Sequence, residues 1–252
     1  SINSAIPNGA VPDVVLPFKV TKADAQAKIS EFVTKRKFFA HPTFTKEFTT
    51  ENISGVYFPY MVIDVNAHSY LSGTGEKLVS EYTVTVDDKE ETRYNADAYH
   101  VERDFDITID DLTIEASADK LNVTSEEKTT NIINSIMPFD TENCVEYNAN
   151  YLRGYTSQKR DVNVDHIRQL VNIQSNDIAR FAANDTLEEY DRGVSWDVDN
   201  FDIKGESWNA AYLPVWLYSY MQVKGKKNLL HYVAVNARTK ETMGSVPINM
   251  TK

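Results

Sequence analysis

Cysteine and glycine are scarce in this sequence, and long apolar runs are missing. Cys144 is the one cysteine among 252 residues, so an intramolecular disulfide is excluded and an oxidising compartment is disfavoured. The nine glycines are about half the usual ~7% share, which leaves little material for glycine-rich phosphate loops. The longest apolar stretch, residues 56–65, contains Pro59 and Asp64 and is shorter than the ~20 residues that a membrane span needs. No signal-peptide pattern opens the sequence. We therefore expect a cytoplasmic chain that does not bind a membrane.

Basic residues are also under-represented. The sequence contains 37 acidic and 26 basic residues, which gives a formal net charge of -11 at pH 7. Proteins that grip nucleic acid through its phosphates are usually basic, so direct nucleic-acid binding by this acidic segment is not expected.

The motifs of several enzyme classes are absent. Gly73-Thr-Gly75 is the one G-x-G, and Leu78 takes the place of the third glycine of a dinucleotide-binding loop. No P-loop is present, and Gly193-Val-Ser195 lacks the closing glycine of a nucleophile elbow. The histidines stand singly and no cysteine pair exists, so neither a metal site nor a cofactor is expected in this segment. The five histidines are His41, His68, His100, His166 and His231.

Two groups of aspartates are the candidates for chemistry. The first contains Asp104, Asp106, Asp110 and Asp111, and the second contains Asp197, Asp199 and Asp202. Their alternation with apolar residues favours the exposed faces of strands. A weak divalent-cation site is the alternative, although no glycine supplies the bend of a calcium loop. A hydrolase built on Asp104 or Asp197 would need a second acid nearby, with one carboxyl in an apolar pocket.

The spacing of apolar residues predicts an α+β fold made of antiparallel β-meanders and about three principal helices. Helical spacing indicates helices over residues 21–38, from Thr124 to Pro138, and from Asn163 or Asp165 to about Ala183. Strand patterns cover residues 55–72, 79–86, 92–102, 105–116, 187–201, 208–223, 229–236 and 242–248. Turns are expected at residues 72–75, 87–89 and 224–227.

We expect residues 1–16 to form a linker and the rest to form two similar units. Residues 17–155 would hold a helix and the first antiparallel β unit, and residues 156–252 a helix and the second, packed together as one globular body. The strand openings at residues 57–61 and 212–216 each contain a tyrosine before the strand proline, which favours a two-fold pseudo-repeat. The alternative is that two amphipathic strands resemble each other by chance.

Aromatic residues are concentrated in the two opening strands. Exposed on a groove or strand, they would bind a peptide or protein partner, and Tyr60, Trp216 and Tyr218 are the candidate residues for this role. The alternative is that these rings fill the core between two sheets, as aromatic residues usually do.

Several short motifs together resemble a known family. They are LPFKVTK (residues 16–22), GVYFPY (55–60), YHVER (99–103), PFD (138–140), YLRGY (151–155), LPVW (213–216) and VNARTKETMG (235–244). The set is similar to the C-terminal region of a Firmicute family of uncharacterised TFIIB-type zinc-ribbon proteins, often mislabelled as primosomal-helicase-like. Ala237 and Lys240 depart from the family pattern, which has glycines at these positions. The resemblance implies no established activity, and it places a zinc ribbon before Ser1, outside this chain.

The leading hypothesis is a non-catalytic binding or scaffold module that follows a zinc ribbon in its parent protein and binds a protein partner. The first alternative is a hydrolase with an unrecognised carboxylate site. The second is an accessory part of a nucleic-acid-binding protein whose contacts and zinc lie in the ribbon.

Overall fold

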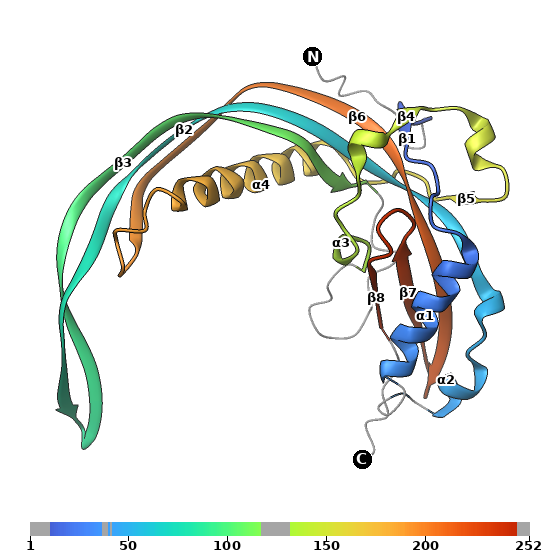
Figure 1. Ribbon diagram of the computed structural model, residues 1–252, viewed down its shortest axis with the longest axis horizontal. Helices are drawn as coiled ribbons and strands as arrows, with labels where there is room; N and C mark the ends of the chain where they lie inside the picture. Colours follow the sequence, from blue (N-terminus) through green and yellow to red (C-terminus); the bar gives the residue numbers. More distant parts are fainter. Residues whose placement is uncertain (1–10, 37–39, 41, 117–131, 246–252) are drawn as a thin grey trace. The chain divides into compact units, whose positions relative to one another are not determined.

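The computed structural model describes residues 11–36, 40, 42–116 and 132–245 (Figure 1). The helices are α1 (Lys22–Arg36), α2 (Pro42–Glu47), α3 (Ile132–Ser135) and α4 (Val164–Asn184), with short 3-10 turns at Thr50–Asn52, Thr141–Asn143 and Ala149–Leu152. The strands are β1 (Val14–Val15), β2 (Ile53–Val86), β3 (Lys89–Glu115), β4 (Val145–Glu146), β5 (Thr156–Ser157), β6 (Val194–Lys224), β7 (Lys227–Asn236) and β8 (Thr242–Gly244). No helix in these described ranges is long and apolar enough to cross a bilayer.

The chain divides into two compact units that share their long strands. Unit 1 comprises residues 1–62, 113–167 and 208–252, and unit 2 comprises residues 63–112 and 168–207. Strands β2, β3 and β6 each contribute residues to both units. This division differs from the expected boundary after residue 155, because both units are assembled from segments far apart in the sequence.

The sheet of unit 1 is mixed. Strand β6 pairs with β7 in antiparallel fashion and with β1 in parallel fashion. Strand β5 adds a second parallel pairing, to β2, while β1 and β4 run antiparallel. The α+β class is confirmed, but the two parallel pairings interrupt a plain meander, and the strand order shows no clear pseudo-repeat.

Unit 1 buries both faces of its sheet, and this explains the unbroken apolar run at the start of β2. Even-numbered residues such as Phe58 and Tyr60 belong to one core with Leu213 and Val215. The second core, on the opposite face of β6, contains Trp216 and side chains of α1 and α2. Because both faces are covered, consecutive residues are apolar rather than alternating.

Unit 2 buries one face of its strands. Odd-numbered β2 residues from Ile63 to Leu71 are buried, whereas their even-numbered neighbours are exposed or half-buried. Helix α4 contributes a buried row of small side chains: Val171, Ser175, Ala179 and Ala183. The strict alternation that begins at Ile63 therefore marks the part of β2 with one solvated face.

The predicted turn at residues 72–75 is wrong, because β2 continues to Val86. Gly73 lies within the strand, and a Cβ atom there would collide with the main-chain carbonyl of Ser195 on β6. Glycine at this position permits a close approach of two backbones rather than a change of direction. The turn at Asp87-Asp88 is confirmed, and both residues have positive φ, as a two-residue type I′ hairpin requires.

Strands β3 and β6 also continue through positions where the sequence predicts a break. The expected breaks after residue 102 and after residue 201 do not occur, since β3 and β6 are continuous. Both places are rich in charged residues on exposed faces. Their polarity resembles that of a loop, although it only reflects the solvated side of a long strand.

The predicted bounds of the helix that ends near Ala183 agree with those of α4. Helix α4 begins after Asn163, whose side chain accepts a hydrogen bond from the Asp165 amide at 2.7 Å. The first part of the helix expected from Thr124 to Pro138 lies outside the described residues, and its last part contains the short helix α3. Helix α1 ends at Arg36, and Pro42 begins α2, a position that proline favours because no helical N–H is required there.

The linker prediction for residues 1–16 needs correction at its end. Residues 1–10 lie outside the described part of the chain. Val14–Val15 form β1, and Leu16 is fully buried in the first core. Apolar residues after Pro12 therefore join the sheet rather than connecting it to another segment.

Candidate functional site

The three aromatic residues expected to bind a partner are buried in unit 1. Tyr60, Trp216 and Tyr218 are 0%, 7% and 2% exposed. The Trp216 Nε1–H group donates a hydrogen bond to the Val20 carbonyl at 2.8 Å. Burial also raises the pKa of the Tyr60 phenol well above its ordinary value. Rings in these positions support the alternative that they fill the core, so the candidate site below does not use them.

The first aspartate group lies on an open face of β3. Asp104 and Asp106 are 62% and 90% exposed, and their carboxylates contact the two ring nitrogens of His68 at 2.5 and 2.7 Å. The hydrogen bond to Asp106 is the main reason why the pKa of His68 is raised. Asp110 is exposed too, while Asp111 is half-buried with a positive φ. This is a cross-strand polar network rather than a desolvated acid pair.

The second aspartate group does not converge either. Asp197 and Asp202 are exposed, and Asp202 is paired with Lys204 at 2.5 Å. Asp199 is 15% exposed and is ion-paired with Arg180 of α4. Neither aspartate group therefore supplies the two acids in one apolar pocket that the hydrolase alternative requires. Among the described residues, no group of three or more His, Cys, Asp or Glu side chains could hold a metal ion.

The remaining single candidates are dispersed. His100 contacts Glu102 at 3.1 Å, and His231 contacts Ser245 and Gln222 at 3.1 and 2.9 Å. Burial lowers the pKa of His231. Cys144 is half-buried and packs against the first core, and His41 lies outside the described residues.

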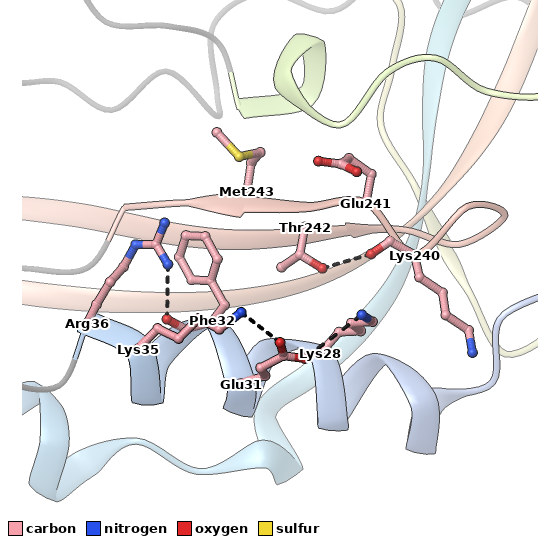
Figure 2. A pocket seen from close by; sticks show the side chains of 9 residues that line it. All are labelled: Lys28, Glu31, Phe32, Lys35, Arg36, Lys240, Glu241, Thr242 and Met243. Carbon is pink, nitrogen blue, oxygen red and sulfur yellow. Dashed lines mark hydrogen bonds and ion pairs between the residues drawn. The ribbon is translucent and has the colours of Figure 1, made fainter.

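Unit 1 contains a groove between helix α1 and strand β8 that the sequence did not reveal (Figure 2). Its volume is about 300 Å³. Helix α1 contributes Lys28, Glu31, Phe32, Lys35 and Arg36. Lys240 and Glu241, which precede β8, and Thr242 and Met243 of β8 form the rest of the lining.

The amphipathic character of α1 places its charged residues at this groove. Ala25, Ile29, Phe32 and Val33 are buried against the sheet. Lys28, Glu31 and Lys35 follow at spacings of three and four residues, so they share the flank of the helix next to the buried stripe.

A tight turn between β7 and β8 positions the other wall of the groove. The side-chain oxygen of Asn236 accepts hydrogen bonds from the main-chain amides of Arg238 and Thr239 at 2.9 and 3.1 Å. Lys240 then adopts φ 68°, a conformation that favours glycine. The turn returns the chain to pair β8 with β7.

The groove is basic although the whole chain is acidic. Three of its four cations lie close to carboxylates: Lys28 and Lys35 contact Glu31 at 3.9 and 2.8 Å, and Lys240 contacts Asp24 at 3.6 Å. The hydrogen bond from Lys35 is the main cause of a lowered pKa at Glu31. These contacts hold the lysines at the groove without removing its positive character.

Arg36 is the cation best placed to bind an anion. Its guanidinium carbon lies 3.5 Å from the centroid of the Phe32 ring, and one of its N–H groups donates to the Phe32 carbonyl at 3.2 Å. Within the described residues, no carboxylate lies within 4.0 Å of this guanidinium. A guanidinium held flat on a ring keeps donors available for a carboxylate or phosphate.

The sequence contained a weak signal for this site. Lys35 and Arg36 are basic residues in the last turn of α1, where cations complement the helix dipole. The groove appears only when residues 28–36 are brought beside residues 240–243, about two hundred positions later. A single sequence has no signal for that pairing.

Comparison with known proteins identifies one distant relative. The chain is 24% identical over 244 residues to the "Uncharacterized protein YdjG" of Bacillus subtilis (strain 168), a match that covers 96% of this chain. The chain spans 65% of the length of that protein. No family model matches the sequence, and no solved structure matches it.

Proposed function

We propose that this chain is a non-catalytic binding module that holds an acidic segment of a protein partner in the groove between α1 and β8. The observation that carries this proposal is Arg36, stacked on Phe32 and lacking a carboxylate partner among the described residues. It lies in a groove with three lysines on a chain of net charge -11. Stacked arginine donors are suited to bidentate binding of carboxylates.

The shape of the groove favours a protein segment over a small metabolite or a nucleic acid. The groove is open and bordered by a strand, so its walls would not enclose and bury a small ligand. A long polyanion would be repelled by the acidic remainder of the chain, whereas a short acidic segment contacts only the basic site. The zinc ribbon implied by the family resemblance is also a proposal, and it would belong to the parent protein.

Binding of an acidic peptide tests the proposal. A fluorescein-labelled decapeptide of alternating glutamate and valine is titrated with the 252-residue chain and followed by fluorescence anisotropy. Arg36→Gln should weaken binding about tenfold or more, since a charge-assisted hydrogen bond is lost. The affinity of Arg36→Lys should lie between those of the wild type and Arg36→Gln, because lysine retains the charge but lacks the planar guanidinium. Raising NaCl from about 0.05 M to about 0.5 M should also weaken binding.

Lys22→Gln is the matched control, because Lys22 is an exposed cation of the same helix that does not line the groove. Equal losses in Lys22→Gln and Arg36→Gln would mean that general charge, not the groove, attracts the peptide. No measurable binding, or tighter binding of a single-stranded oligonucleotide of equal charge, would contradict the proposed function.

A further inference from the structure

The outer edge of β8 borders the groove. β8 pairs with β7 on its inner side, and no other described strand pairs with it. The Asn236 amide donates to the Glu241 carbonyl, and the Ser245 amide donates to the Tyr232 carbonyl. Hydrogen-bonded pairs alternate in an antiparallel ladder, so the main-chain groups of Thr242 point away from β7.

The same alternation applies to Gly244. Thr242 and Gly244 together offer two N–H groups and two carbonyls at the free edge of β8. Neither residue carries a hydrogen bond from this edge to another described residue. Charged side chains and proline are the usual means of blocking a strand edge, and residues 242–244 contain neither.

Side chains on the two faces of β8 differ in their surroundings. Thr242 lies on the α1 side, opposite Val235 of the second core, while Met243 lies on the other face (Figure 2). A strand added to this edge would direct alternate side chains toward α1 and toward the Met243 face. On the α1 side they would meet Lys35 and Arg36.

We propose that the acidic segment binds as an extended strand along the free edge of β8, with acidic side chains facing α1 and apolar side chains on the Met243 face. This inference rests on the proposed function and adds the conformation and sequence pattern of the ligand. Main-chain pairing with Thr242 and Gly244 provides affinity, and the alternating faces provide specificity. A helical ligand would leave the free groups of β8 unpaired.

Backbone methylation of the peptide gives the primary test. Two versions of the Glu-Val decapeptide are made, one N-methylated at every glutamate and one at every valine. Only one set of amides in a strand faces β8. We expect one version to bind about tenfold or more weakly than the parent peptide, and the other to bind within about threefold of it. Equal effects of the two methylations would overturn the strand arrangement.

A protein variant tests the same edge from the other side. Thr242→Pro removes the outward N–H group, at an edge position that proline tolerates. It should weaken binding of the parent peptide about tenfold, while Thr242→Val, which keeps the amide and the branched shape, should bind like the wild type. Circular dichroism and thermal unfolding report whether Thr242→Pro still folds. If it does not, the methylated peptides alone decide the question.

The pattern of the ligand is tested with a permuted peptide. A decapeptide of five glutamates followed by five valines has the same composition but cannot separate the two residue types between two faces. We expect it to bind at least about fivefold more weakly than the alternating peptide. If the permuted and methylated peptides all bind like the parent and all depend on Arg36, the groove binds acidic segments but not as a strand. Absence of all binding would instead reject the proposed function.

Discussion

Replacing Trp216 with alanine should lower the free energy of unfolding by about 3–5 kcal/mol, the usual cost of removing a large ring from a core. The indole is 7% exposed and lies at edge-on distances of 5.1 and 6.0 Å from the rings of Phe18 and Tyr155. The substitution would also leave the buried Val20 carbonyl without its hydrogen bond from Nε1. Guanidinium unfolding followed by circular dichroism measures the change.

Val223→Ala is the control for Trp216→Ala. Val223 lies on the same strand, β6, but is 71% exposed. Its truncation should change the free energy of unfolding by less than about 0.5 kcal/mol. A Trp216→Ala protein as stable as Val223→Ala would show that the Trp216 ring is not packed as described, and would restore it as a candidate for binding a partner.

Asp140→Asn should lower the free energy of unfolding by about 2–4 kcal/mol at neutral pH, because it breaks a largely buried ion pair. Arg238 is 13% exposed, and its Nε and Nη2 atoms donate to the Asp140 carboxylate at distances of 2.6 to 3.1 Å. The variant would retain the Arg238 contact with the Pro17 carbonyl, so the remaining charge would be poorly compensated.

The same pair predicts a pH dependence. The hydrogen bonds from Arg238 lower the pKa of Asp140 below its ordinary value of 3.8. A lowered pKa stabilises the folded chain above pH 3.8, and this contribution is lost as the pH falls through the folded-state pKa. The stability difference between wild type and Asp140→Asn should therefore shrink as the pH falls from about 5 to about 2.

Glu91→Gln serves as the control for both measurements. Glu91 contacts Arg93 at 3.3 Å, but each side chain is 52% exposed. Exposed pairs contribute little to stability, so this variant should unfold like the wild type at neutral pH and show the same pH dependence. An equal loss of stability in the two variants would mean that burial of the Asp140–Arg238 pair has no special effect.

Local patterns predicted the elements that depend on local forces. The cap at Asn163 and the apolar spacing located α4 to within a residue or two. The spacing identified its buried face only in part. Ile167 and Val171 are fully buried, but Ile178 and Phe181 are 37% and 71% exposed, and the polar Ser175 is fully buried. Which of two apolar stripes packs on a sheet depends on the shape of the sheet, and α4 uses the stripe with smaller side chains.

The candidate site could not be predicted for a different reason. Its wall residues are ordinary in sequence: a basic helix end and a polar turn. Their function arises when the Asn236-centred turn places β8 alongside α1, so that Thr242 and Arg36 line the same groove. The aromatic residues were conspicuous in the sequence and suggested a binding surface. Rings such as Tyr60 and Trp216 are abundant instead because they fill two cores.

The continuity of β2 through both units limits how this protein can change in evolution. Side chains alternate along a strand with a period of two, so inserting one residue near position 63 would exchange the buried and exposed faces of everything that follows. Ile63 and Leu71 would then turn to solvent, and Asp64 would turn inward. Length changes should therefore occur in pairs of residues matched on neighbouring strands. Homologues aligned across residues 53–86 should differ by even numbers of residues, with odd differences confined to the Asp87-Asp88 turn.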